Sequence, residues 1–311
     1  MRVTSNAFPD TLVRQLARLN ERQNRLQNQA ATGQRIQTLA EDPAAARRTL
    51  GIQSESRAVG QYRKNIATLQ ENVTITFGVM KGLKKISDRA NEIAVLADGT
   101  RSPAELQILA GEVTQLIRQG VQLANSQHRG DYVFGGNRTD RAPFVLEADA
   151  NGVATGVTYR GDSSASEVEI ASGETMSVQH VGANSSGSGP QGLISDPRSG
   201  ADFFNHLISL HKNLMAGKTD EIRAVDLRGL QRDEDNFISH FARQAALQSR
   251  LEATDTMARL RSDTLEKQVS QEVDADLAET IVRLTETQNA YRAALQSAGT
   301  ILNQSLMDFI R

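Results

Sequence analysis

The chain has 311 residues, of which 4% are aromatic, and it contains neither tryptophan nor cysteine. So few aromatic rings favour long helices over a conventional globular core, and the absence of cysteine excludes disulfides, thiolate zinc sites and cysteine nucleophiles. The 35 basic and 37 acidic side chains nearly cancel, so we expect no nucleic-acid partner and no membrane partner, and no apolar run or N-terminal secretory signal suggests a membrane span or a cleaved leader.

The N-terminal segment, residues 1–42, carries apolar residues at alternating steps of four and three. This spacing keeps a narrow apolar seam on one side of a helix, as in coiled coils. It predicts a terminal helix that packs against a partner helix. The large apolar side chains of this seam are Leu12, Leu16, Leu19 and Leu26.

Residues 43–130 are expected to form a helical rod. All six prolines of the chain fall where the apolar periodicity breaks, which leaves the stretches between them free to be helical. Asp42 is placed to cap a helix that has Pro43 in its first position, and this helix extends roughly 80 Å at ~1.5 Å per residue. A capping-box pattern at Ser102 and Glu105 predicts the start of a further helix.

Residues 131–199 show a different period and are expected to form a small β-rich insertion. Short runs at Val153–Tyr159 and Val168–Ile170 are bounded by Asn-Gly and Ser-Gly turn signals, which indicates antiparallel strands. The sequence GANSSGSGPQG at residues 182–192 predicts a flexible loop.

Helical spacing returns at about residue 201 and predicts a second rod over residues 200–272 and a terminal helix over residues 273–311. The fold class is therefore mainly α: long antiparallel helical rods with coiled-coil terminal helices, plus a small antiparallel β insertion. The apolar seam of the last helix keeps the steps of four and three and contains Leu277, Ile281, Leu284, Tyr291, Leu295 and Leu302.

Motifs for chemistry are absent or weak, so we predict no catalytic, metal or cofactor site. Gly187, Gly189 and Gly192 match the pattern GxGxxG, but they are surrounded by Asn, Ser and Pro. No parallel-sheet pattern precedes them and no helix follows them directly, as a dinucleotide-binding turn would require. The five histidines include no HExxH, and the closest pair is five residues apart, which is about 140° around a helix. The sequence therefore predicts a protein that is not an enzyme.

The two ends of the chain carry opposite charges. Residues 1–48 hold eight arginines and four acids, a net charge of +4, and residues 263–286 hold seven acids and two bases, a net charge of -5.

Burying about seven apolar side chains of the last helix stabilises it by roughly 10–20 kcal/mol, whereas ordering its backbone costs roughly 35–70 kcal/mol. We therefore expect the terminal helices to need neighbouring subunits, although an ordinary intramolecular core is the alternative interpretation of the seams.

Two terminal stretches resemble the bacterial flagellin family. Residues 31–46 (ATGQRIQTLAEDPAAA) are similar to the family segment in which a seam helix turns into a second helix, and residues 274–309 are similar to the family's last helix. The positions that carry the N-terminal resemblance are Gly33, Arg35, Ile36, Asp42 and Pro43.

A third stretch, residues 123–144, resembles the members of that family that join hook to filament. It contains Tyr132, Phe134 and Gly136, where filament flagellins usually have a Phe-Asn-Gly element. Pro43 also favours the junction members, because flagellins usually have alanine there. A short filament flagellin and an unrelated coiled-coil scaffold remain as alternatives.

The resemblance implies a structural subunit that joins hook to filament, templates flagellin assembly and lies outside the cell on the flagellum. It implies export without a cleaved signal peptide through the flagellar type III apparatus. The implied partners are a ring of like subunits, a hook-associated protein on the hook side, flagellin on the filament side, and an export chaperone on the C-terminal helix. No cofactor is implied.

Overall fold

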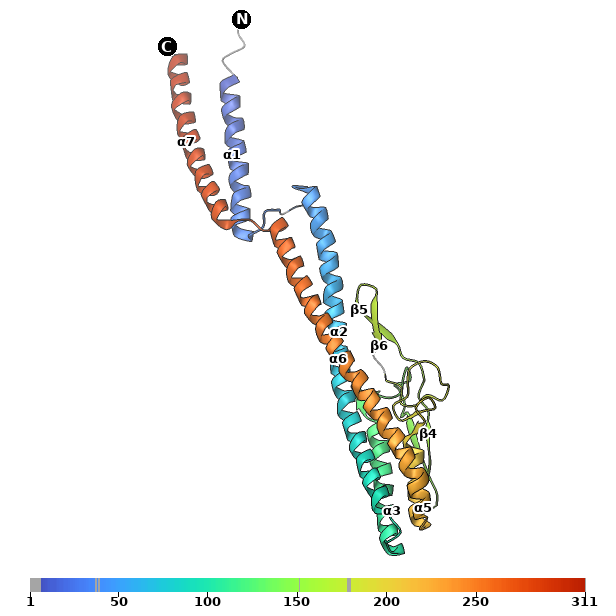
Figure 1. Ribbon diagram of the computed structural model, residues 1–311. Helices are drawn as coiled ribbons and strands as arrows, with labels where there is room; N and C mark the ends of the chain where they lie inside the picture. The colour runs from blue at the N-terminus through green and yellow to red at the C-terminus, as the bar shows by residue number, and fades with distance from the viewer. Residues whose placement is uncertain (1–6, 37, 39, 151, 178–179, 311) are drawn as a thin grey trace. The chain divides into compact units, whose positions relative to one another are not determined.

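The protein is described by a computed structural model (Figure 1), which covers residues 7–36, 38, 40–150, 152–177 and 180–310. Its helices are α1 (Ala7–Thr32), α2 (Pro43–Leu96), α3 (Pro103–Ala124), α4 (Phe203–Met215), the short α5 (Thr219–Glu221), a π-helical turn η1 (Ile222–Asp226), α6 (Leu227–Val273) and α7 (Leu277–Ile310). Among the described residues, no helix is both long enough and apolar enough to span a membrane. The mainly α fold class is confirmed.

Four small two-stranded sheets lie between α3 and α4 in the chain. Each pairs neighbouring strands in antiparallel register, which agrees with the antiparallel β insertion expected from the turn signals. The strands are β1 (Gln127–His128), β2 (Asp131–Tyr132), β3 (Phe144–Ala148), β4 (Ala154–Tyr159), β5 (Glu167–Ala171), β6 (Glu174–Ser177), β7 (Ser195–Asp196) and β8 (Ala201–Asp202).

The chain divides into two compact units. The terminal unit combines the chain up to Val59 with the chain from Leu260 onward, and the central unit is Gly60–Arg259. Both borders fall inside long helices, α2 and α6, whereas the borders expected from the sequence follow residues 42, 130, 199 and 272.

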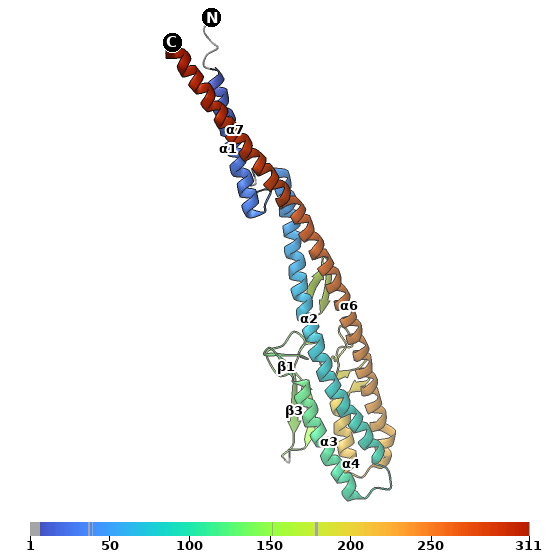
Figure 2. The ribbon, with the colours of Figure 1, turned by 90° about the vertical axis from the view of Figure 1, so that its left-hand side faces the viewer.

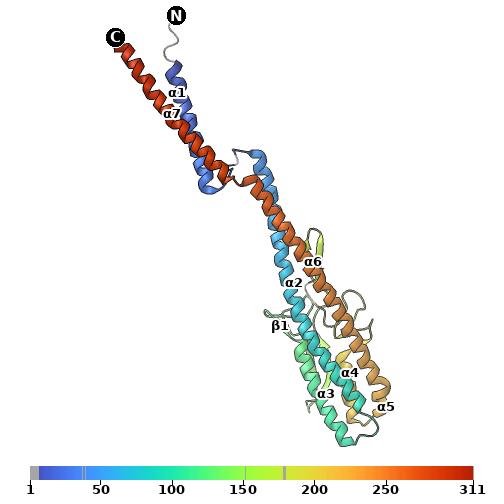
Figure 3. The same ribbon diagram turned by 60° about the vertical axis from the view of Figure 1, so that its left-hand side comes forward.

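The central unit contains the main hydrophobic core. α3 packs along α4. Figures 2 and 3 show both helices beside the C-terminal half of α2 and the N-terminal half of α6. Aromatic rings from the β insertion and the helices meet in this core, where Phe144 contacts Phe204 and Phe203 contacts Phe237 at centroid distances of 5.6 and 5.2 Å. The insertion is thereby fixed to the helices through buried side chains.

Local signals place the start of α3 as predicted. The Ser102 hydroxyl accepts a hydrogen bond from the Glu105 backbone N–H, and the Ser102 backbone N–H donates to the Glu105 carboxylate at 2.8 Å. This reciprocal capping box satisfies N–H groups that the first helical turn leaves unpaired. The break between α4 and α6 was not predicted, because the sequence indicated one continuous rod here. The two helices separate after Gly217, whose backbone is left-handed (φ 67°).

The loop at residues 182–192 has a defined hydrogen-bond network that its composition did not predict. Buried Asn184 donates through its side-chain amide to the carbonyls of Ser188 and Pro190 at 2.6 and 2.7 Å. Gly192 donates its N–H to the buried carboxylate of Asp196 at 2.9 Å. Composition indicated a flexible segment because it cannot reveal such buried polar anchors.

Candidate assembly site

The two terminal helices, α1 and α7, lie side by side in the terminal unit (Figure 1). On α1, the seam residues Leu12, Leu16 and Leu19 are half-buried, and Leu26 is 7% exposed. These positions share one side of the helix because steps of four and three return to the same face. The seam of α1 therefore lies on the face that packs against α7.

On α7, the face that packs against α1 includes only part of the apolar seam predicted from the sequence. Its most buried described residues are Thr280, Thr287 and Ala298, with Leu284 and Tyr291 half-buried between them. The Thr287 hydroxyl donates to the carbonyl of Arg283 at 2.7 Å, which satisfies this buried polar group within its own helix.

The remaining seam residues of α7 lie on the exposed side of this contact. Leu277, Ile281 and Leu295 are 48%, 55% and 46% exposed. The side chain of Leu302 lies outside the described residues. Among the side chains of α1 and α7 that are described, only Leu26 and Ala298 are buried hydrophobic residues, so the helix pair leaves an uncovered apolar stripe along one edge.

The linkers that follow α1 and precede α7 pair with each other and form what we call the linker joint, residues 33–42 and 272–276. Gly33 accepts a hydrogen bond from Ala275 N–H at 2.8 Å, and Arg35 N–H donates to the Val273 carbonyl. Gly33 adopts φ 72°, a left-handed conformation that favours glycine at a helix C-terminus. Ile36 is half-buried beside this pairing.

Charged side chains hold the linker joint together. Arg35 donates to the Glu272 carbonyl at 2.7 Å and lies 3.6 Å from Asp42. Arg48 makes a two-pronged ion pair with Glu272, with both N–O distances at 2.9 Å. Sequence reasoning missed Arg48 and Glu272, since no local motif links residues so far apart; the opposite charge of the two ends was the only signal.

The same contacts set the protonation of the linker joint. The Asp42 carboxylate caps α2 by accepting from Ala45 N–H at 3.0 Å, and this bond lowers the pKa of Asp42. Pro43 follows in the first helical position, as predicted. The hydrogen bond from Arg48 lowers the pKa of Glu272, and Glu272 in turn raises the pKa of Arg48. All three groups are therefore charged near neutral pH.

The central unit holds the remaining motif residues. Phe134 is fully buried in the main core, and Tyr132 is half-buried in the short strand β2. The backbone of Gly136 comes so close to the Asp162 carbonyl that a Cβ would lie 2.1 Å from its oxygen. These residues therefore shape the insertion.

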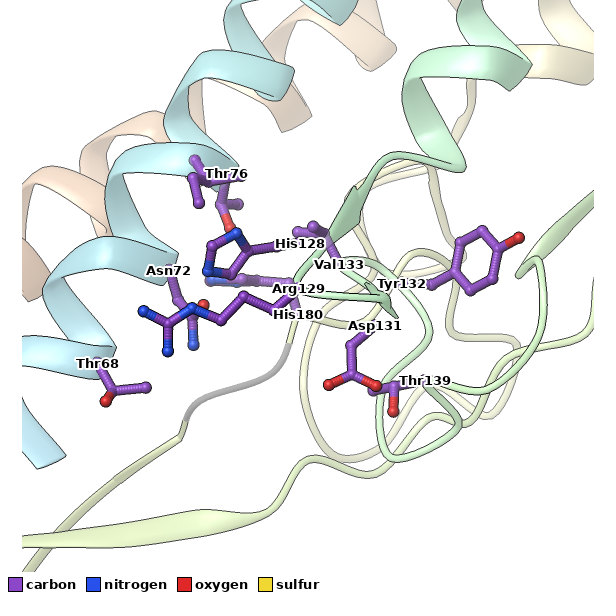
Figure 4. Close-up of a pocket in the computed structure, with 11 residues that line it drawn as sticks. Thr68, Asn72, Thr76, His128, Arg129, Asp131, Tyr132, Val133, Thr139 and His180 are labelled. Atoms are coloured by element: carbon purple, nitrogen blue, oxygen red, sulfur yellow. The ribbon is translucent and has the colours of Figure 1, made fainter.

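A hollow of about 290 Å³ lies between α2 and the start of the insertion (Figure 4). His128 and His180 lie toward Thr76 and Asn72 of α2, while the ring of Tyr132 points away from that helix. Among the described residues, the buried Oγ1 of Thr76 and Nε2 of His128 find no hydrogen-bond partner, although Nε2 lies 3.4 Å from the Glu71 carboxylate. Within the described residues, no group of three or more His, Asp and Glu side chains is arranged to hold a metal ion.

Comparison with known proteins agrees with the sequence resemblance. The model of the bacterial flagellin N-terminal helical region matches residues 3–139. The chain is 25% identical over 301 residues to flagellar hook-associated protein 3 of Salmonella typhimurium, covering 92% of each chain. It is also 25% identical to the Escherichia coli protein of the same name, covering 89% of this chain and 90% of the relative.

Solved structures share the fold. A flagellar hook-associated protein from Vibrio parahaemolyticus, described as putative, matches with a TM-score of 0.63 and 18% identity, over 75% of this chain and 100% of that one. Bacillus cereus FlgL matches with a TM-score of 0.56 and 20% identity, over 71% and 99% of the two chains.

Proposed function

We propose that this chain is a structural protein of the flagellum rather than an enzyme and that it joins the hook to the filament, since it is similar to the bacterial flagellin N-terminal helical region over residues 3–139 and to flagellar hook-associated protein 3 over most of its length. It carries out this role by presenting terminal helices on which flagellin assembles. The relatives named hook-associated protein 3, similar over about nine-tenths of the chain, support the junction role.

One observation carries the assembly part of the proposal: α7 has an apolar stripe that α1 does not cover. Leu277, Ile281 and Leu295 are about half exposed on a helix whose other face is already packed. Uncovered apolar area of this kind marks protein contacts, and burial against another helix stabilises by about 25 cal/mol per Å². Like helices of neighbouring subunits, above and below in the flagellum, supply a matching surface.

Export and partners follow from the same role. The chain passes through the flagellar export apparatus, and a chaperone covers the apolar stripe of α7 until assembly. In the flagellum, copies of the chain form a ring between a hook-associated protein and flagellin. The absence of cysteine suits a chain that is exported unfolded, because no disulfide can form before folding.

A deletion strain tests the proposal. We expect cells without this chain to build hooks and to export flagellin that remains in the medium as monomer, with no motility, and plasmid-borne wild-type chain to restore filaments. Normal filaments on the deletion strain, when the genome holds no second copy, would refute the junction role and favour a filament flagellin instead.

A further inference from the structure

Three arginines form an exposed row on α1, which we call the arginine face. Arg18, Arg22 and Arg25 are all exposed. At 100° per residue, they fall within about 60° around the helix and span about 10 Å along it. The row is therefore a compact cationic surface beside the apolar seam.

Arg22 and Arg25 line a hollow of about 320 Å³ together with Asp276 and Glu279 from the other end of the chain, but the arginine face is not fixed there by ion pairs among the described residues. Among the described residues, no ion pair joins Arg18, Arg22 or Arg25 to a carboxylate, although Glu21 lies next to the row. On α7, Glu279 is paired with Arg283 of the same helix at 2.5 Å.

A second surface of the terminal unit carries the complementary charge. A hollow of about 670 Å³ at the end of α6 is lined by Asp263, Glu266 and Asp274, with Lys267 beside them. We call it the acidic groove; its charged side chains sum to -2, three carboxylates against one ammonium. The C-terminus of α6 adds the negative end of a helix dipole. No ion pair occupies these three carboxylates in the described part of the chain.

We propose that the arginine face of one copy docks onto the acidic groove of a second copy, an inference that rests on the proposed ring of like subunits. The arginines span about 10 Å and the carboxylates about 16 Å along their helices, a difference that long guanidinium side chains can bridge. Arginine also pairs with carboxylates through two parallel hydrogen bonds, which fixes geometry. Because the surfaces differ, the contact is head-to-tail, the kind that closes into rings.

Disulfide trapping tests the contact, because the chain has no cysteine of its own. Cells that lack the native chain would co-express an epitope-tagged Arg22→Cys copy and an untagged Glu266→Cys copy, and isolated flagella would be oxidised mildly. We expect a mixed dimer, at least tenfold more abundant than with the matched control Glu286→Cys, an exposed acid of α7. Flagella that contain both copies but no mixed dimer above the control would overturn the inference.

Charge reversal gives a second measurement. Arg22→Glu should lower the amount of the chain recovered in flagella several-fold, and adding Glu266→Arg to the same chain should restore it. Unchanged recovery in the single variant, or no restoration in the double variant, would contradict the docking. Absence of even the unmodified chain from purified flagella would count against the proposed function instead, so the two failures are distinguishable.

Discussion

Gly136 shows how a single residue shapes the β insertion. It adopts φ 61°, and a Cβ there would lie 2.1 Å from the Asp162 carbonyl oxygen and 2.8 Å from that of Ser164. Its N–H donates to the His180 carbonyl at 3.2 Å. Both the conformation and the space at this position therefore require glycine, which gives a structural reason for the motif residue that the sequence analysis selected by resemblance.

We expect Gly136→Ala to destabilise the central unit by about 2–4 kcal/mol, because a left-handed backbone and a steric clash are combined. Urea unfolding followed by circular dichroism measures this change. The matched control is Gly78→Ala in α2, where nothing lies within 4 Å of the added Cβ; it should stabilise by about 0.5–1 kcal/mol. Equal effects of the two variants would contradict this account of Gly136.

Asp196 is a second residue that shapes the insertion, in this case through buried hydrogen bonds. Its side chain is fully buried, and it accepts hydrogen bonds from the Arg198 guanidinium and from Gly192 N–H. The Arg198 hydrogen bond is the main reason that the pKa of Asp196 is lowered to about 2 from 3.8. A lowered carboxyl pKa stabilises the fold above pH 3.8, and this contribution is lost as the pH falls toward 2.

We expect the free energy of unfolding to fall between pH 4 and pH 2 by about 2 kcal/mol more in the native chain than in Asp196→Asn. Urea titrations of both proteins across this range provide the comparison, so that acids common to both cancel. Parallel pH profiles would show that Asp196 does not carry this dependence.

At the scale of elements, the signals that predicted structure correctly are local in sequence. The capping box at Ser102 and Glu105 and the Asp42-Pro43 helix start depend on residues within one turn of each other. The separation of α4 from α6 was missed because Gly217 is an isolated glycine inside an apolar pattern that fits one helix as well as two. Buried partners such as Asn184, or Arg48 with Glu272, depend on distant residues and leave no local pattern.

The terminal helices also show what apolar periodicity can predict and what it cannot. Steps of four and three identified an apolar stripe on each helix, and the structure places Leu16 and Leu26 on the side of α1 that meets α7. Periodicity alone could not reveal that Ile281 and Leu295 stay exposed, because the width of an apolar stripe does not say how many partners share it. The assignment of these residues to subunit contacts stays a prediction.

We expect Leu295→Asp to abolish incorporation into flagella while changing the free energy of unfolding of the isolated chain by less than about 0.5 kcal/mol. The side chain is 46% exposed in the single chain, but a charge buried in a subunit contact costs several kcal/mol unless it is paired. The control Gln296→Asp places the same charge on the neighbouring exposed position and should assemble normally. Normal assembly of Leu295→Asp would exclude this stripe from the contact.

At the scale of the whole molecule, the two units differ in how they are stabilised. Among the described residues, the largest fully buried side chains, including Phe134, Phe203 and Phe237, all lie in the central unit. Few of the apolar side chains described in the terminal helices are buried, and helices gain most of their stability from packing. This division fits a subunit whose central unit folds alone and whose ends become fully packed only in the flagellum.

The most direct test of this account is the position of the protein on the flagellum. Immunogold labelling of intact flagella with antibodies against the central unit should place gold only where hook meets filament, and the deletion strain provides the background. Gold distributed along the filament would contradict the junction role.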